Sequence, residues 1–336
     1  MMFLKGVGAL ILTIACFSLF SLKFPKGDKA MGGLANAAVA TFLMEAIYKY
    51  IFGDFLKIGF LGEVGTACGG MGGAASAALV GLAMGTNPIY AVAMGAAVSG
   101  IGILPGFIAA YVLHFVLDRL EKLLPEGLDV IVCALFAAAA GRGVAALVDP
   151  AVSAVIRTVG DAIMVATMQT PLVMGFVLGG IMKIICTSPL SSMALTAMLG
   201  LTGLPMGIAA TASFGGAFSD GMVFRRLNFG NRSNALGVML EPLTQADIVT
   251  KNPIPIFCSN FFGGGLSGIV AVKLGIINNA PGTCAPIPGF LAPFAFNKAS
   301  TVLLAMALAA CCGALSGFVG STVFARLGFR KEKPAE

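Results

Sequence analysis

Long runs without a single charged side chain most constrain what this chain can fold into. Eight such runs occur: Gly6–Leu22, Ala30–Met44, Val64–Leu117, Ala162–Met182, Ile184–Ser219, Asn252–Val272, Leu274–Asn297 and Ala299–Ala325. A helix needs about 20 apolar residues to cross the hydrocarbon core of a bilayer, and several of the runs have that length. Val64–Leu117 is long enough for two crossings. The pattern predicts an all-α polytopic membrane protein.

The composition excludes a soluble globular protein, because 58% of the residues are hydrophobic and only 11% are charged. Charged residues are the ones that cover the surface of a soluble domain. The 8 cysteines show no C-x-x-C spacing, so we expect neither a metal site nor a disulfide framework. In a membrane protein a net charge of +6 helps to set the orientation of the chain in the bilayer and does not indicate nucleic-acid binding. We therefore expect no cofactor and no nucleic-acid partner.

The first apolar run fits two interpretations. Lys5 followed by an apolar stretch to Leu22 has the form of a secretory signal. It is followed by further membrane runs rather than by a soluble domain. We therefore interpret residues 6–22 as a first transmembrane helix.

The placement of Lys and Arg predicts a topology. Cationic residues gather in three places that the positive-inside rule assigns to the cytoplasm: Lys23, Lys26 and Lys29; Arg225, Arg226 and Arg232; and the tail with Arg326, Arg330, Lys331 and Lys333. The stretch 118–126 mixes acids and bases, so we expect it outside. Counting crossings between these anchors predicts about nine or ten transmembrane helices. Residues 1–336 then form a single integral membrane transporter domain, with 326–336 as a cytoplasmic tail.

Two of the uncharged runs are unsuited to one straight helix. Ile184–Ser219 contains Pro189 and Pro205, and Leu274–Asn297 carries four prolines. Proline removes a helical hydrogen bond and clashes with the preceding turn. Non-helical backbone at membrane depth occurs only where it is buried in protein or lines a cavity, and such breaks point to transport sites. We therefore predict re-entrant or broken hairpin elements in both runs.

A polar stretch between two apolar regions offers the densest set of binding groups. Between Leu240 and Pro253 it combines carboxylates, amides and hydroxyls with two prolines. We select as solute-binding candidates Glu241, Thr244, Gln245, Asp247 and Asn252. Carboxylates accept hydrogen bonds from sugar hydroxyls, while the amides both donate and accept. The competing interpretation is a solvated cytoplasmic loop after the Arg225 cluster.

A hydroxyl cluster at the Pro189 break supplies further candidates, namely Ser188, Ser191 and Ser192. Such a break fits the tip of a re-entrant hairpin, or the hydroxyls bond back to helix carbonyls. His114, the only histidine, is expected at a membrane interface at a helix end.

Placing other ionisable residues inside a membrane costs free energy. We expect these to pair with one another in the bundle or to lie at interfaces: Glu45, Lys49, Glu63, Arg142, Arg157, Asp161, Lys183 and Asp220. The sequence does not assign the pairs, and it offers no credible catalytic centre.

Three segments carry a family resemblance: Gln169-Thr170-Pro171-Leu172-Val173-Met174, Thr187-Ser188-Pro189-Leu190-Ser191-Ser192-Met193-Ala194 and Gly203-Leu204-Pro205-Met206-Gly207-Ile208-Ala209-Ala210. They resemble the membrane IIC components of bacterial phosphotransferase systems, in the compact branch that includes perfringolysin-regulator-like membrane proteins. Glu241-Pro242 and Asn252-Pro253 are similar to the Glu-Pro and Asn-Pro elements of that group. The resemblance covers about 30–297.

The resemblance implies a homodimeric sugar permease that binds its substrate between re-entrant hairpins. It also implies that Glu241 contacts sugar hydroxyls and that phosphate comes from a separate IIB protein. The chain departs from the family pattern in two respects. It contains no IIA or IIB domain, and no histidine lies near Glu241. Both departures put phosphorylation-coupled transport in doubt.

The resulting hypothesis is a permease of the phosphotransferase IIC type in the bacterial cytoplasmic (inner) membrane. Its solute is expected to be small and polar, a sugar or a related hydroxylated compound. One alternative is an ion-coupled secondary transporter of the same fold that uses Glu241 or Asp247 as the coupling carboxylate. The other is a membrane sensor or regulator that binds a ligand without transporting it.

Overall fold

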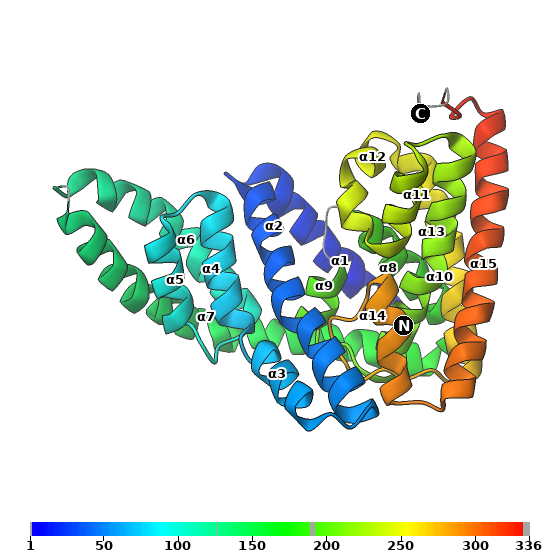
Figure 1. Cartoon of the computed structure of the whole chain (residues 1–336), viewed down its shortest axis with the longest axis horizontal. Coiled ribbons are helices and arrows are strands. Elements are labelled where there is room, and N and C mark those ends of the chain that lie inside the picture. Colours follow the sequence, from blue (N-terminus) through cyan, green and yellow to red (C-terminus); the bar gives the residue numbers. More distant parts are fainter. Residues whose placement is uncertain (1, 126, 189–191, 332–336) are drawn as a thin grey trace. The chain divides into compact units, whose positions relative to one another are not determined.

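The chain is helical through most of its length (Figure 1). The structure is a computed structural model that describes residues 2–125, 127–188 and 192–331, and no β-strand occurs in these ranges. A helix satisfies its own backbone hydrogen bonds, which an apolar medium requires of any lipid-exposed segment. The all-α fold predicted from the uncharged runs is confirmed.

Several helices are long and apolar enough to cross a bilayer. The described residues contain six of them. They are α1 (Met2–Lys23), α2 (Gly27–Ala38) with its π-helical continuation (Val39–Leu43 and Ala46–Phe55), α6 (Ile103–Leu123), α7 (Leu128–Gln169), α13 (Pro253–Leu274) and α15 (Ala299–Arg326). A seventh span arises if α3 (Gly59–Gly69) and α4 (Gly72–Met84), bent by 57°, count as one. The chain is therefore a polytopic membrane protein. The number of nine or ten transmembrane helices stays a prediction.

The longest helix, α7, contains 42 residues. At 1.5 Å per residue it extends about 60 Å, roughly twice the thickness of a hydrocarbon core. It continues through Arg142, Pro150 and Arg157, in a part of the sequence without a long uncharged run. The Arg142 guanidinium donates to the carbonyls of Ala97 and Ser99 at 3.1 and 2.7 Å. It thereby caps the end of α5 (Pro88–Ala97).

The chain divides into two compact units. One, which we call the C-terminal unit, comprises Met1–Leu10, Asp161–Thr196 and Leu201–Glu336. The other, the N-terminal unit, comprises Ile11–Gly160 and Ala197–Gly200. The single transporter domain expected over 1–336 stays a prediction.

In the N-terminal unit, His114 lies in a polar cluster beside the middle of α6. It is buried, its Nε2 lies 2.7 Å from the Lys26 ammonium, and its Nδ1 lies 2.8 Å from the Thr86 hydroxyl. Lys26 also donates to the carbonyl of Met84, the last residue of α4. The expected place at a helix end is wrong, because α6 continues to Leu123, and the ring is enclosed rather than exposed.

The same contacts place the first basic cluster beside α6. Lys26 lies in the first basic cluster, and its partner His114 lies one helical turn before Asp118. Tyr111 on that face of α6 donates to the carbonyl of Pro25 at 3.0 Å. Residues 23–29 thus lie beside the middle of α6, one turn before Asp118, and the sides of the membrane on which 23–29 and 118–126 lie stay a prediction. The run Val64–Leu117 holds most of α3, all of α4 and α5, and much of α6, so it contains most of the bent α3–α4 pair and of one further candidate span.

Both proline-rich runs are interrupted, as predicted. In the first run, α8 (Pro171–Thr187) ends before the proline break, and α9 (Ser192–Met198) and α10 (Gly203–Leu227) follow. In the second run, residues 275–285 are non-helical and precede α14 (Pro286–Leu291) and a 3-10 turn, Ala292–Ala295. Whether either element is re-entrant stays a prediction.

In the C-terminal unit, α10 packs against α8, α13, α14 and α15, and Figure 1 shows α15 running beside α10 and α13. The Arg225 cluster and the chain after α15 lie together at one end. Arg226 donates to the hydroxyl of Thr322 at 3.2 Å, and the Lys331 amide donates to the carbonyl of Leu227 at 3.0 Å. These contacts are consistent with the prediction that the Arg225 cluster and the C-terminal tail lie on the same side of the membrane.

Cysteine labelling tests this arrangement. In a cysteine-free background, single cysteines at Pro25 and Leu124 should react with an impermeant thiol reagent from the same side of the membrane. The reason is that Lys26 contacts His114 on α6, the helix that ends just before Leu124. A cysteine at Ser233, beside the Arg225 cluster, should be protected from reagent added outside intact cells. Labelling of Pro25Cys and Leu124Cys from opposite sides would contradict the helix arrangement.

Candidate solute site

Glu241 lies at a sharp turn between two short helices of the C-terminal unit. It ends α11 (Arg232–Leu240) and begins the 3-10 turn Pro242–Gln245, called η3, in an extended conformation. Pro242 favours the first position of η3, because it has no N–H to satisfy. The Glu241 side chain is half-buried, and its carboxylate accepts from the Leu243 amide at the long distance of 3.5 Å.

The other polar residues of this turn bind mainly to the turn itself. Thr244 donates to the Glu241 carbonyl at 2.8 Å, and the Gln245 amide donates to the Thr244 hydroxyl at 3.1 Å. Gln245 also accepts from Asn234 at 2.7 Å. These bonds hold the shape of the turn. The structure does not direct Thr244 or Gln245 toward the Glu241 carboxylate.

Two further candidates lie beyond η3. Asp247 is exposed on α12 (Ala246–Lys251). Asn252 is buried between α12 and α13, where its amide donates to the Ile248 carbonyl at 2.8 Å. Asn252 therefore joins two helices.

The hydroxyl cluster after α8 divides between local and long-range contacts. Ser188 donates to the carbonyl of Ile185 at 2.8 Å, the back-bonding expected at a helix end. Ser192, at the start of α9, instead donates to the carbonyl of Cys284. Ser191 lies outside the described residues. The Ser192 bond brings the two interrupted segments together.

Asparagine side chains satisfy the non-helical backbone of residues 275–285. The Asn278 side chain accepts from the Ala280 amide at 2.9 Å, the Asn278 backbone amide donates to the Gly203 carbonyl at 2.9 Å, and the Gly203 amide donates to the Asn279 side chain at 3.0 Å. Asn297 accepts from the Ile277 amide at 3.1 Å and donates to the Ile277 carbonyl at 2.7 Å. An irregular segment buried away from water needs such partners.

α10 lies close against this loop. A side chain at Gly207 would place its Cβ 1.9 Å from the Ile276 carbonyl oxygen, so the contact requires glycine. One and a half turns further on, the Ser213 hydroxyl lies 3.0 Å from the Cys284 sulfur.

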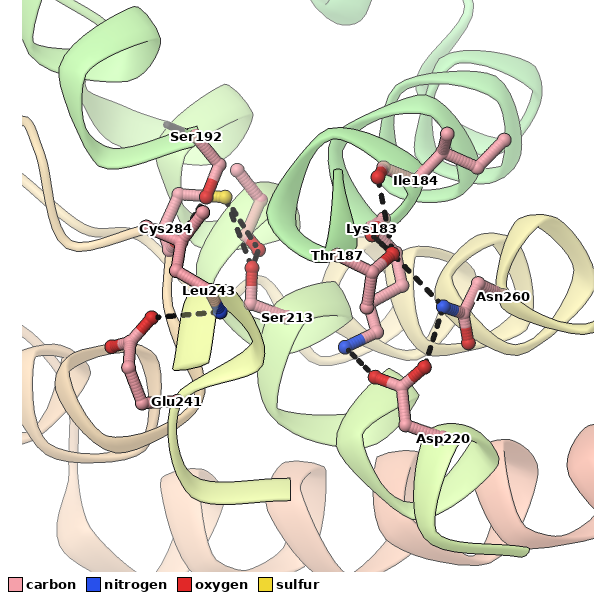
Figure 2. A network of polar contacts seen from close by, with 11 residues as sticks. Lys183, Ile184, Thr187, Ser192, Ser213, Asp220, Glu241, Leu243, Asn260 and Cys284 are labelled. Carbon is pink, nitrogen blue, oxygen red and sulfur yellow. Dashed lines mark hydrogen bonds and ion pairs between the residues drawn. The ribbon is translucent and has the colours of Figure 1, made fainter. Parts of the chain in front are cut away.

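Figure 2 shows Glu241 and Leu243 in the same region as Ser192, Ser213 and Cys284. η3 packs on α8, and α11 packs on α14. The turn of Glu241 therefore adjoins helices that flank both interrupted segments.

A buried ion pair lies on the other side of this region in Figure 2. The Lys183 ammonium on α8 is 2.7 Å from the Asp220 carboxylate on α10, and both side chains are fully buried. Asn260 on α13 donates to the other Asp220 oxygen at 2.7 Å and to the Thr187 hydroxyl at 3.0 Å. The network joins three helices through charge-assisted hydrogen bonds.

Comparison with known families decides the identity of the fold. A family model described as "Phosphotransferase system, EIIC" matches residues 28–335. The chain belongs to this EIIC family. Searches of curated proteins and of solved structures gave no match.

Membership makes the protein an EIIC component, a permease of the sugar phosphotransferase type, and a multi-pass membrane protein. The family works with separate IIB and IIA proteins and takes sugar substrates. The described part of the chain contains no group of three or more His, Cys, Asp or Glu side chains that could hold a metal ion.

The ion pair is the feature of this EIIC protein that sequence reasoning left unassigned. Lys183 separates two long uncharged runs, and Asp220 ends the second of them. Both were expected to pair with some partner, but eight ionisable residues were candidates. The sequence feature that singled out Lys183 and Asp220 was their isolation between apolar runs. The pairing itself needed the packing of α8 on α10.

Gly207→Ala tests the close contact between α10 and the second interrupted segment. The added methyl must push the Ile276 carbonyl away, so we expect a loss of about 1–3 kcal/mol in stability and a lower Tm of the purified protein. Gly143→Ala on α7, where the methyl would enter open space, is the matched control and should leave Tm unchanged or slightly raised. Equal Tm values for Gly207→Ala and the parent would show that the contact is absent.

Proposed function

We propose that this EIIC protein carries a small polar solute, a sugar or related hydroxylated compound, across the bacterial cytoplasmic membrane. Glu241 contacts the solute directly in this proposal. The Glu241-Pro242 pair is the residue-level counterpart of the family's Glu-Pro element. The site would lie between the turn of Glu241 and the two interrupted segments.

The incomplete bonding of the Glu241 carboxylate is the observation that carries the proposal. In the described part of the chain its carboxylate receives one hydrogen bond, from Leu243 at 3.5 Å. An ionised carboxylate can accept about four hydrogen bonds, so most of this capacity is open. A half-buried carboxylate of this kind gains from hydroxyl donors. Two neighbouring hydroxyls of a sugar are suited to its two oxygens.

Other predicted residues take supporting parts in the proposal. Ser188 and Ser192 border the first interrupted segment and would supply hydroxyls to the solute; Ser191 belongs to the same proposal. Thr244 presents a further hydroxyl beside the turn. Gln245 and Asn252 act by fixing the turn, as their bonds to Asn234 and Ile248 suggest, and Asp247 stays a candidate at its exposed edge.

The proposal includes partners. A separate IIB protein would phosphorylate the solute after it has crossed, and two copies of the chain would form a homodimer. A solute that enters proteoliposomes only with IIB and a phosphate donor present would support this coupling. Uptake that needs only a proton or sodium gradient would indicate the ion-coupled alternative. Binding without flux would indicate the sensor alternative.

Glu241→Gln tests the site. The substitution keeps the shape and removes the charge, so solute affinity should fall about tenfold to a hundredfold, because a charge-assisted hydrogen bond contributes about 1.5–3 kcal/mol. Membrane insertion and folding should change little. The measurement is a titration of purified protein with the solute that most raises the Tm of the parent in a screen of sugars.

The control is Glu63→Gln, the same chemical change at an exposed position of α3 in the other unit. It should bind the solute as the parent does. If Glu241→Gln also retains parental affinity and transport, Glu241 is a loop residue and the proposed site is wrong.

A further inference from the structure

Arg226, in the last turn of α10, reaches across to α15. Its guanidinium carbon lies 4.2 Å from the centre of the Phe318 ring, and its Nη2 donates to the Thr322 hydroxyl at 3.2 Å. A guanidinium has five N–H donors, and the Thr322 bond uses one of them. Because Arg226 is exposed, the other donors remain open to a ligand at the surface.

The face of α15 beside Arg226 is apolar and exposed. Phe318, Val319 and Val323 are 44%, 53% and 49% exposed. α15 is long and apolar enough to cross a bilayer, so such a face suits contact with lipid acyl chains. The helix ends three residues after Val323, at Arg326. Arg226 therefore lies where the apolar face ends and the polar headgroup region is expected to begin.

A second arginine lies next to the first on this face. Arg326 follows Thr322 by four positions, and residues four apart on a helix are neighbours, with Cβ atoms about 5–6 Å apart. α10 and α15 thus each bring a guanidinium to Thr322. The salt bridges among the described residues involve lysines and no arginine. Neither Arg226 nor Arg326 therefore has a carboxylate partner in the described part of the chain, and a bound anion would relieve their mutual repulsion.

The chain after α15 adds positive charge at the same end of the C-terminal unit. The Lys331 backbone amide donates to the Leu227 carbonyl at 3.0 Å, and the Lys331 ammonium lies 5.5 Å from the centre of the Phe229 ring. Residues 327–331 are thereby held against the end of α10, and they include the exposed Arg330. A cationic end thus borders an apolar face.

We propose that Arg226 and Arg326 bind the phosphate of an anionic phospholipid whose acyl chains lie along Phe318, Val319 and Val323. Guanidinium groups donate two parallel hydrogen bonds to phosphate oxygens. The surface matches a ligand that carries negative charge and hydrocarbon in one molecule, which distinguishes such a lipid from inorganic phosphate and from an acidic protein. The cytoplasmic leaflet is anionic and attracts basic residues next to a membrane span, and the positive-inside rule predicts this end of the chain in the cytoplasm. The inference does not depend on the proposed solute site.

Tryptophan fluorescence tests the site, because the chain contains no tryptophan of its own. Phe318→Trp keeps an aromatic ring under Arg226 and places one fluorophore at the site. The purified full-length variant is reconstituted into phosphatidylcholine vesicles that contain, at the same mole fraction, either phosphatidylglycerol or phosphatidylcholine with brominated acyl chains. Bromine quenches tryptophan only on close contact. Brominated phosphatidylglycerol should occupy the site with about fivefold higher relative affinity, since each basic residue near the membrane surface contributes about that factor.

Substitutions that remove the charge identify the binding groups. Arg226→Gln and Arg326→Gln together, in the Phe318→Trp background, should bring the relative affinity of the two lipids close to one. Leu308→Trp, made in the parent, is the matched control, because Leu308 is also exposed on α15 and lies about 15 Å along the helix from Phe318. Quenching at this position should be the same for both lipids.

Three results would overturn the proposal. Equal quenching of Phe318→Trp by both lipids would show that no anionic headgroup is selected. A preference that survives removal of both arginines would place the headgroup on other residues. Quenching by neither lipid, with Leu308→Trp quenched normally, would show that a protein surface covers this face. If Phe318→Trp does not fold, Val319→Trp on the same exposed face takes its place with the same expectations.

Discussion

Backbone polar groups away from water must find their partners within the protein, and the C-terminal unit depends on this constraint. Residues 275–285 are not helical, so their amides and carbonyls have no helical partners. The Asn278 backbone amide donates to the Gly203 carbonyl instead, and the Asn297 side chain bonds both the amide and the carbonyl of Ile277. The same bonds fix the loop against the start of α10. An irregular segment can persist at membrane depth only when it is enclosed in this manner.

Enclosure of one broken segment by another gives the unit its polar interior. The Ser192 hydroxyl reaches the Cys284 carbonyl, so the start of α9 and the second broken segment stabilise each other. α10 lies beside both, with Gly207 at the closest contact. The helices α8, α10 and α13 continue this polar interior through Lys183, Asp220 and Asn260. Breaking one partner of a buried pair typically costs about 3–5 kcal/mol, so these groups constrain one another strongly.

The sequence predicted the helical class and both interruptions, because uncharged length and proline act locally on the backbone. It predicted helix ends less well. Asp118 was assigned to an external connection, yet α6 continues to Leu123, since charged residues are as compatible with a helix end as with a loop. The 42-residue α7 escaped detection because Arg142 and Arg157 divide its sequence, although their long side chains are accommodated on one helix. Charge marks where a chain meets polar surroundings, not where its helix stops.

The site shows the same limit. Proline and carboxylate identified the turn of Glu241, and serine identified the break after α8. The partners of Thr244, Gln245 and Asn252 lie within the turn or its adjoining helices, which spacing alone does not reveal. The Lys183–Asp220 pair depends on tertiary packing of residues far apart in the sequence.

A structure of the full-length protein with its solute bound tests the central claim most directly. The account predicts the solute between the turn of Glu241 and the two interrupted segments, with at least one solute hydroxyl in hydrogen-bond contact with the Glu241 carboxylate. It also predicts Lys183 on Asp220 in that state. A solute bound elsewhere, with Glu241 facing bulk water, would contradict the account.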